Sequence, residues 1–280
     1  MKQLPEISVI MGVYNQRSDT TMLQRAVQSI LGQSYGDFEF LICDDGSCEA
    51  VTSALDEFAS GDPRIRLLRG GGKYTLPQKL NYCLRFAKGR YIARMDDDDY
   101  SFPERFELQM KLLSENPEIS FIGSNVNLIR NGKLIGERIL PAFPKKEDFL
   151  FVQPYIHPTL IFRREALDIV GGYSEKRWQL LCEDFDLLLR MYEKGLIGCN
   201  VQKTLFDYTL PPIGRSKRKF QHRLNEAVTR WERFQSLNML PAALPYVVKP
   251  LIVGLIPEKI LERMKERHYS KNNNHESRNE

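Results

Sequence analysis

The sequence predicts an α/β fold, with a mostly parallel sheet flanked by helices and a basic helical region after it. Apolar runs of strand length alternate with segments of helical spacing through the first 115 residues, as in parallel sheets with helical crossovers. Charge is divided unevenly along the chain. Residues 1–210 hold 26 basic and 29 acidic side chains (net −3), whereas residues 211–280 hold 14 and 7 (net +7). We therefore expect a mildly acidic body with a basic C-terminal appendage.

The first part of the chain supplies four strands and four helices in alternation. The opening run ISVIMGV is apolar almost throughout, which predicts a strand buried on both faces. Apolar residues spaced three and four apart predict the helices, and Gly89 and Pro103 mark two of their boundaries. The expected strands cover 7–13, 38–43, 65–68 and 90–95, and the expected helices cover 23–31, 51–58, 76–87 and 103–114.

The middle of the chain is richer in strands. Segments 121–129 and 134–140 flank Asn131-Gly132, a dipeptide typical of two-residue hairpin turns. A further strand is expected at 159–162. Helices are expected at 164–170, closed by Gly171-Gly172, and at 185–194, stopped by Gly195.

The five cysteines, an odd number, are widely spaced and form no CxxC motif. We expect reduced thiols in a cytoplasmic protein, with neither a disulfide framework nor a structural zinc site. The N-terminal apolar run is broken by Pro5 and Glu6, and no apolar stretch of about 18 residues occurs. The sequence therefore predicts neither a signal peptide nor a spanning helix.

Two of the expected strands end in acidic clusters, Asp44-Asp45 and Asp96 to Asp99. In open α/β sheets ligands bind beyond the carboxyl ends of the strands, so a binding site is expected there. The Asp96 to Asp99 loop has no His or Cys nearby, and such carboxylates suit Mg²⁺ or Mn²⁺, which commonly bridge to substrate phosphates. The alternatives are a helix cap for the first cluster and a solvated surface turn for the second.

Other phosphate and metal signatures are missing. The chain has no GxxxxGK[ST] motif and no GxGxxG after the first strand, and Ser101 stands where an EF-hand loop needs glycine. The Gly70-Gly71-Gly72 run is interpreted as a flexible loop only.

Several segments taken together resemble the family-2 glycosyltransferases. They are ISVIMGVYN, LQRAVQSILGQSYGDFEFLICDDGS, KGRYIARMDDDDYSFPERFELQ, HPTLIFRREALDIVGGY and CEDFDLLLR, in the family's order over residues 5–210. The resemblance implies a GT-A fold with a Rossmann-like sheet, and an inverting enzyme that uses a nucleotide-sugar donor.

The resemblance also assigns donor-site residues. The nucleotide base is expected near Gly12, Tyr14 and Asn15, and Tyr14 could stack on it, with plain loop packing as the alternative. Asp45, with Asp44 beside it, matches the base-and-ribose contact. In the DxD motif, Asp98 matches the metal ligand, Asp96 a ribose or metal-water contact, and Asp97 lies close to the nucleotide. Asp99 is expected to cap the following helix. Lys79 and Asn81 are candidate donor contacts, and a solvated face is the alternative for Lys79.

The catalytic residues follow from the ED motif. Asp184 matches the general base, and Glu183 would orient the acceptor or its loop, while Asp186 is expected to be structural. His157 either lines the acceptor pocket or is a hydrogen-bonded His before Pro158. The sequence departs from the family pattern in having DDDD for the commoner DADD, and Cys182 where a small residue is common.

The implied reaction is a single displacement at the anomeric carbon. It moves a sugar, with a UDP-sugar favoured as donor, to a hydroxyl of a glycan or lipid-linked acceptor. Such a reaction needs a divalent cation for the leaving diphosphate and a carboxylate base for the acceptor hydroxyl. The alternatives are a sugar nucleotidyltransferase and a non-catalytic nucleotide-sugar or membrane-binding protein.

We expect three regions: a catalytic domain at 1–210, a basic amphipathic helical region at 211–269 and a disordered tail at 270–280. Within 215–267, Trp and Phe interleave with Arg and Lys. This pattern fits a segment that binds the anionic lipids on the inner face of the cell membrane. The alternative is that the apolar faces pack on the catalytic domain. No nucleic-acid motif accompanies the charge, so nucleic acid is not an expected partner.

Overall fold

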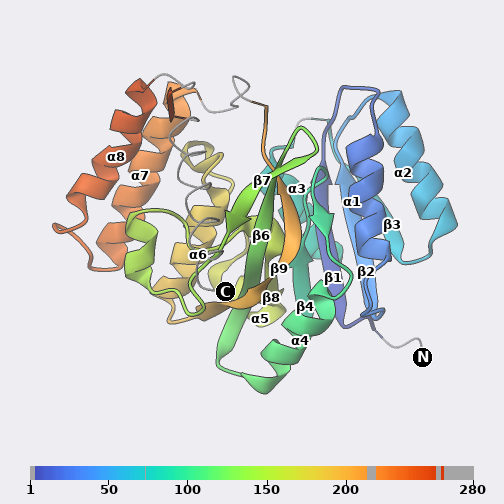
Figure 1. Cartoon of the computed structure of the whole chain (residues 1–280), viewed down its shortest axis with the longest axis horizontal. Coiled ribbons are helices and arrows are strands. Elements are labelled where there is room, and N and C mark those ends of the chain that lie inside the picture. The colour runs from blue at the N-terminus through green and yellow to red at the C-terminus, as the bar shows by residue number, and fades with distance from the viewer. Residues whose placement is uncertain (1–3, 73, 213–218, 257–259, 262–280) are drawn as a thin grey trace, which may run out of the picture.

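The structure, a computed structural model, describes residues 4–72, 74–212, 219–256 and 260–261. It is an α/β fold built on one nine-stranded sheet with helices on both faces (Figure 1). In chain order the elements are β1 (Ile7–Val13), α1 (Thr21–Leu31), β2 (Phe38–Asp44), α2 (Glu49–Gly61), β3 (Ile65–Arg69), α3 (Leu76–Phe86), β4 (Tyr91–Arg94), β5 (Tyr100–Ser101), α4 (Arg105–Glu115), β6 (Ile119–Arg130), β7 (Lys133–Arg138), η1 (Lys146–Leu150), η2 (His157–Thr159), β8 (Ile161–Arg163), α5 (Arg164–Val170), η3 (Arg177–Gln179), α6 (Glu183–Glu193), β9 (Ile197–Thr209), α7 (Phe220–Ser236) and α8 (Leu244–Leu255).

The sheet has a parallel half and a mixed half. Its order is β3-β2-β1-β4-β8-β6-β9-β5, with β7 added to β6. The pairs β1–β2, β1–β4 and β2–β3 are parallel. Strand β8 runs antiparallel to β4 and β6, whereas β9 runs parallel to β6. The parallel half therefore brings the ends of β1, β2 and β4 to one edge of the sheet.

Strand β1 shows why the sheet needs cover on both faces. Ile7, Val9, Met11 and Val13 belong to the core beneath α1, α2 and α4, while Ile10 belongs to the core beneath α3, α5 and α6. A strand with apolar residues at nearly every position cannot leave either face in water. The expected burial of this strand on both faces is confirmed.

The hairpin in the middle of the chain forms where the sequence predicted it. Asn131 (φ 51°) and Gly132 (φ 73°) both have positive φ, as a two-residue turn between right-twisted strands requires. Gly171 (φ 75°) closes α5 in the left-handed conformation.

Strand β9 is the largest element that the sequence analysis did not assign. Its polar residues Asn200, Gln202 and Lys203 break the apolar alternation, and its pairing with β6 contains register shifts. The short strand β5, which immediately follows the acidic run, pairs with β9 and was also not assigned. Both strands form by pairing with segments that are distant in sequence, so the local residue pattern predicts them poorly.

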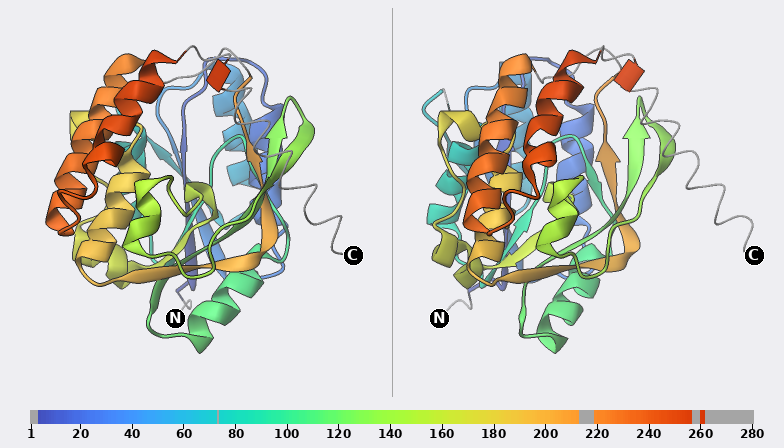
Figure 2. Two further views of the ribbon diagram at one scale, coloured as in Figure 1. Left: turned by 60° about the vertical axis from the view of Figure 1, so that its left-hand side comes forward. Right: turned by 90° about the vertical axis from the view of Figure 1, so that its left-hand side faces the viewer.

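Helices α7 and α8 lie side by side against the α6 side of the molecule (Figure 2). Phe234, Leu237, Met239 and Val247 join the same core as residues of α3 and α6. The basic segments 213–218 and 262–280, and with them the expected disordered tail, lie outside the described residues. In the described part of the chain, no helix is long and apolar enough to cross a membrane.

Candidate active site

The carboxyl edge of the parallel half gathers the predicted donor residues. Val13 at the end of β1 pairs with Asp44 at the end of β2, so Asp45 and Tyr14 leave neighbouring strands at the same level. Asp96 follows two residues after the end of β4. Adjacent parallel strands thus deliver both acidic clusters to one edge.

Asp45 is held under the glycine loop that precedes α3. Its side chain is 1% exposed, and it accepts hydrogen bonds from Gly72 N (2.7 Å) and from Tyr74 N. A Cβ on Gly70 would stand 2.3 Å from Asp45 Oδ1. The glycines therefore allow backbone to approach a carboxylate closely, which is a more specific role than the flexible loop we expected.

Asp44 is engaged inside the fold. Its oxygens accept from Arg69 (2.5 Å), Thr52 Oγ1 (3.3 Å) and Ser47 N (3.2 Å), and the residue is 3% exposed. These contacts tie β2 to α2 and β3. A donor contact at Asp44 stays a prediction beside this structural role.

Lys79 connects the first strand to the acidic residues. It is 5% exposed, so the alternative of a solvated face is wrong. Its Nζ donates to Val13 O (3.0 Å) and lies 5.4 Å from the ring centroid of Tyr14. Burial lowers the pKa of Lys79, and Asp45 and Asp97 oppose that shift because they face the ammonium. Tyr14 is 58% exposed, which leaves most of its ring accessible to a ligand.

Gly12 and Asn15 have structural contacts of their own. A Cβ at Gly12 would lie 3.1 Å from atoms of Leu76 and Lys79, so this glycine lets α3 pack on β1. Asn15 N donates to Ser47 Oγ (3.1 Å), which links the β1 and β2 loops.

Asn81 is committed to a different part of the site. Its amide donates to Tyr173 O (2.8 Å) and accepts from Tyr173 N (2.9 Å). Both backbone groups of Tyr173 are thereby fixed to α3. A donor contact at Asn81 stays a prediction beside this structural role.

The four aspartates of the acidic loop have different environments. Asp96 forms an ion pair with Arg94, which is fully buried, and Asp98 lies at the exposed surface of the loop. Asp99 is 1% exposed and accepts from Thr209 N (2.7 Å) on β9. Burial, together with the charges of Asp98 and Asp96, raises the pKa of Asp99 well above its usual range.

The expectation that Asp99 caps the following helix is wrong. The N-cap of α4 is Glu104, and Asp99 instead anchors the end of β9. This anchor is reinforced by Thr209 Oγ1, which donates to Asp98 O (2.6 Å). The acidic loop is therefore braced by a strand that is more than one hundred residues away in sequence.

The residues of the acidic loop fit a hard divalent cation that shares its coordination with a ligand. Among the described residues, no group of three His, Cys, Asp or Glu side chains converges as a metal site. Asp98 and Asp96 offer carboxylate oxygens at the surface of the loop, and oxygen is what Mg²⁺ and Mn²⁺ prefer. Two carboxylates leave several positions that phosphate oxygens and water would have to fill.

The Glu183-Asp184 motif begins α6. Asp184 accepts from Gln153 Nε2 (2.9 Å) and, through Oδ1, from Phe185 N (2.8 Å). Glu183 is 6% exposed, and its Oε2 has no hydrogen-bond partner within the described chain. Burial, and then the charge of Asp184, raises the pKa of Glu183 to about 7.

The acidic loop and the ED motif lie close to one another around two tyrosines. Burial raises the pKa of Tyr173, and the charges of Asp184 and Asp96 add to that shift. Burial likewise raises the pKa of Tyr208, with contributions from Asp96 and Asp184. Coulombic interaction weakens with distance, so both predicted motifs lie within electrostatic range of the same two tyrosines.

His157 lies beneath this site. It is 8% exposed, and its Nε2 shares a hydrogen bond with Tyr173 Oη (2.8 Å). Burial, and the nearby charge of Arg94, hold the pKa of His157 well below its usual range, so the ring is neutral. Of the two alternatives, the geometry favours a hydrogen-bonded support for Tyr173.

The sequence analysis did not predict three residues of the site, which are Arg94, Tyr173 and Gln153. Arg94 could have been noticed, because a charged residue in an apolar strand two positions before the acidic run is unusual. Tyr173 and Gln153 carry no such local signal, since each reaches the site from a loop.

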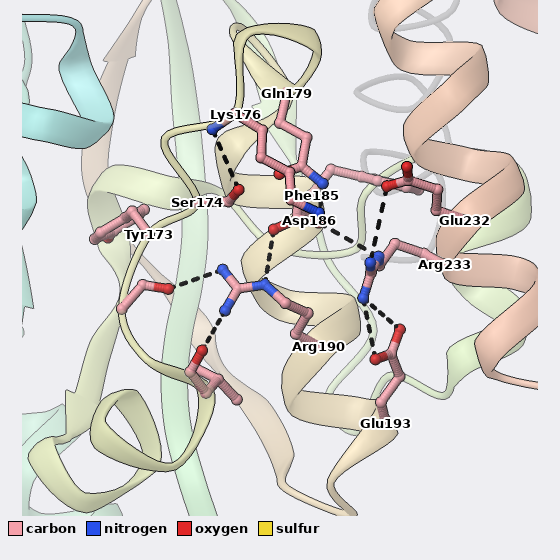
Figure 3. A network of polar contacts seen from close by, with 12 residues as sticks. Tyr173, Ser174, Lys176, Gln179, Phe185, Asp186, Arg190, Glu193, Glu232 and Arg233 are labelled. Carbon is pink, nitrogen blue, oxygen red and sulfur yellow. Dashed lines mark hydrogen bonds and ion pairs between the residues drawn. The ribbon is translucent and has the colours of Figure 1, made fainter.

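Asp186 has the structural role expected of it. It is fully buried and accepts from Gln179 Nε2 (2.7 Å) and Arg190 Nε (2.7 Å), and Arg233 of α7 forms an ion pair with it (Figure 3). A cavity of about 200 Å³ lies beside these side chains. None of the predicted donor or catalytic residues lines that cavity.

Comparison with known proteins agrees with the fold and with the family that the sequence motifs indicated. The family model for glycosyl transferase family 2 matches residues 8–170. The Bacillus subtilis (strain 168) glycosyltransferase EpsE is 32% identical over 264 residues, covering 94% of each chain. The Escherichia coli O-antigen biosynthesis glycosyltransferase WbnJ is 31% identical over 224 residues, covering 75% of this chain and 82% of WbnJ.

This protein belongs to glycosyl transferase family 2, and is thus an enzyme that transfers a sugar from a nucleotide sugar. Solved structures agree on the fold. S. aureus TarS 1-349 in complex with UDP-GlcNAc has a TM-score of 0.69 at 15% identity, over 87% of this chain and 73% of that TarS fragment. The mannosyltransferase PcManGT from Pyrobaculum calidifontis, in complex with GDP-Man and Mn²⁺, has a TM-score of 0.61 at 18% identity, over 94% and 80%. The expected GT-A fold and enzyme class are confirmed.

Proposed function

We propose that this enzyme transfers its sugar with inversion, by one metal-assisted displacement at the anomeric carbon. The proposal is carried by two acidic groups of different character whose charges act on the same tyrosines, Tyr173 and Tyr208. One is the surface-exposed acidic loop with Asp98, and the other is Asp184 at the start of α6. An in-line displacement needs a charge-stabilising group on the leaving side and a base on the attacking side, and this pair supplies both.

Asp184 is the proposed general base. It would accept the proton of the acceptor hydroxyl as the oxygen attacks the anomeric carbon. Gln153 and the Phe185 amide hold its oxygens in a defined orientation. Glu183, largely protonated below pH 7, limits the negative charge beside the base and orients its loop. A general base of this kind is typically worth about 10²- to 10⁴-fold in rate.

The proposed donor site lies over Tyr14, Lys79 and Asp45. Tyr14 has an exposed ring that can stack on a nucleobase, and the Lys79 ammonium lies beneath it. Asp45 would reach the base or ribose once its bonds to the Gly72 and Tyr74 amides are exchanged. We propose a UDP-sugar as donor, in line with the UDP-GlcNAc complex of TarS, although PcManGT holds GDP-Man.

We propose Mg²⁺ or Mn²⁺ as cofactor, held by Asp98 with Asp96 beside it. Bound there, the cation would neutralise the charge that develops on the leaving nucleoside diphosphate. Arg94 balances one charge of the loop through Asp96, and Asp98 is the exposed carboxylate of the loop, which supports Asp98 as the main protein ligand.

We propose a glycan or lipid-linked hydroxyl as acceptor, in surface polysaccharide assembly. The name of WbnJ, which refers to O-antigen biosynthesis, supports this acceptor class. We also propose a cytoplasmic enzyme that rests on the inner face of the cell membrane. Apolar side chains exposed along the outer faces of α7 and α8 support that location, and they are Phe220, Leu224, Val228, Trp231, Val248, Ile252 and Leu255.

Two substitutions test the proposed reaction. Asp184→Asn should lower turnover by about 10²- to 10⁴-fold and leave donor binding nearly intact, because it removes only the base. Asp98→Ala should weaken Mn²⁺-dependent donor binding. Donor hydrolysis across UDP-, GDP- and dTDP-sugars gives turnover, and thermal shift with Mn²⁺ gives binding.

Asp168→Asn is a matched control, because Asp168 is an exposed carboxylate on α5 that lies outside the site. It should leave both measurements unchanged. Wild-type turnover in Asp184→Asn at saturating donor would show that the base has been assigned to the wrong residue.

A further inference from the structure

Helix α7 contacts the two residues that directly follow Asp184. Phe234, which is fully buried, packs edge-on against Phe185 with 6.2 Å between ring centroids. The guanidinium of Arg230 lies 4.8 Å from the centroid of the same ring. Arg233, one turn further along α7 from Arg230, forms an ion pair with Asp186 (3.4 Å). The two residues that follow the predicted base on α6 are thus both held from α7.

Asp186 is the centre of a charge network that links several elements (Figure 3). From η3, Gln179 donates to it, and from α6 itself Arg190 donates to it. From α7, Arg233 reaches both Asp186 and Glu193 (2.9 Å). A fully buried carboxylate needs such partners, because an unpaired buried charge is strongly destabilising.

The network continues to the segment that carries Tyr173. Arg190 donates to Val170 O (2.6 Å) and Gly172 O (2.8 Å), at the end of α5. Tyr173 comes next in the chain and contacts His157. A displacement of Asp186 would therefore shift both Asp184 and the segment that carries Tyr173.

The loop that leads into the ED motif contains a residue with an unfavourable backbone conformation. Leu181 has φ of 63°, in the left-handed region that a leucine rarely adopts. Such a residue keeps its conformation only where the surroundings over-determine it. Here Gln179 is fixed to Asp186, and α7 packs on η3.

We infer that α7 is a positioning element for the ED motif, and that Arg233 is a positioning residue that acts on Asp184 through Asp186. This inference rests on the proposed role of Asp184 as base. It gives the C-terminal helices a part in the reaction that is separate from any membrane contact. The ion-pair partners of Arg233 are Asp186, Glu193 and Glu232, none of which is a proposed donor contact, so we expect its effect on the rate of the chemical step.

The test compares two arginines of the same helix in the full-length protein. Arg233→Met keeps the aliphatic stem and removes the ion pairs with Asp186 and Glu193. Arg223→Met is the control, since Arg223 pairs with Glu226 within α7 and packs on α8. Hydrolysis of the fastest-reacting nucleotide sugar, with Mn²⁺ and below the melting temperature of both variants, gives kcat and the donor KM.

We expect Arg233→Met to lower kcat by about 10-fold or more with the donor KM within about twofold of wild type, because small misplacements of a base are costly. Arg223→Met should keep the wild-type kcat. Arg233→Lys should recover part of the rate, since it restores a charge beside Asp186. Equal kcat losses in Arg233→Met and Arg223→Met would overturn the inference.

A double-mutant cycle separates this inference from the proposed function. If Arg233 acts through Asp184, Arg233→Met should have little further effect in an Asp184→Asn background. Its full effect in that background would overturn the positioning role. Wild-type turnover in the Asp184→Asn single variant would instead contradict the proposed base. The two failures are therefore seen in different variants.

Discussion

Gly70 packs its α-carbon against the carboxylate of Asp45, in a space where no side chain fits. A Cβ at this position would lie 2.3 Å from Asp45 Oδ1 and 2.9 Å from its Cγ, so the loop or the carboxylate would have to move. The Gly70–Gly72 segment is therefore part of the proposed donor site as well as a connection between β3 and α3.

Gly70→Ala should raise the donor KM by displacing Asp45 while leaving kcat close to wild type. The physical reason is the steric overlap with Asp45, which bonds the Gly72 amide. Steady-state donor hydrolysis measures both constants. Gly61→Ala is the control, because a Cβ on Gly61 has nothing within 4 Å. An unchanged donor KM in Gly70→Ala would contradict a role of Asp45 in donor binding.

Glu183 is a buried carboxyl whose titration should be visible in stability. Its pKa rises from 4.5 to about 7 on folding, mainly through burial. Between these values the folded protein keeps a proton that the unfolded chain has lost, so Glu183 makes the protein less stable as pH rises.

Glu183→Gln removes this titration and should therefore gain stability relative to wild type as pH rises from 4.5 to 7. The gain should be at most about 1.4 kcal/mol for each pH unit. Urea unfolding of both proteins across this range measures it. A difference between the two proteins that stays constant with pH would mean that Glu183 titrates normally.

At the scale of the element, α7 has two faces with opposite roles. Phe234 is fully buried against Phe185, whereas Trp231 is 46% exposed. Both residues are aromatic and lie within one turn of the helix, so they make a matched pair. The inner face belongs to the core, and the outer face carries the proposed membrane contacts.

Phe234→Ala should reduce the free energy of unfolding by about 3–5 kcal/mol, because it removes a buried ring and leaves a cavity. Trp231→Ala should cost well under half of that, since nearly half of its surface is already in water. Denaturant unfolding of the two variants gives the comparison. Equal losses would mean that the inner face of α7 does not belong to the core.

At the scale of the whole molecule, the C-terminal helices cannot be treated as a removable appendage. Leu237, Met239 and Val247 are buried in the core that also contains residues of α3 and α6. A chain that ends at residue 210 would expose that core, so point substitutions on the outer face are the better probe of membrane binding.

We expect the full chain to float with vesicles of phosphatidylcholine and phosphatidylglycerol. A variant that combines Ile252→Glu and Leu255→Glu should lower the vesicle-bound fraction at least about tenfold. Each side chain is more than half exposed, and burial of a Leu or Ile in the bilayer interface is worth about 1.5–3 kcal/mol. Leu134→Glu, at an exposed leucine of the β6–β7 hairpin, is the control. If the two substitutions on α8 float like wild type, α8 does not contact the membrane.

The sequence alone determined the parallel half of the sheet, the hairpin turn at Asn131-Gly132, and the two strand ends where carboxylates gather. These features depend on residues near one another in the chain, such as the apolar run of β1 and the acidic run after β4. The motif order over residues 5–210 indicated the family, and the match over residues 8–170 confirms it.

Only the tertiary structure decided how these parts support one another. It placed β9 beside β6 so that Thr209 braces Asp99, and it laid Gly72 over Asp45. It also turned the basic helix inward, where Arg233 joins Asp186. Each of these contacts joins segments far apart in sequence, with no shared periodicity to reveal them, because burial and charge pairing are satisfied only when the whole chain is folded.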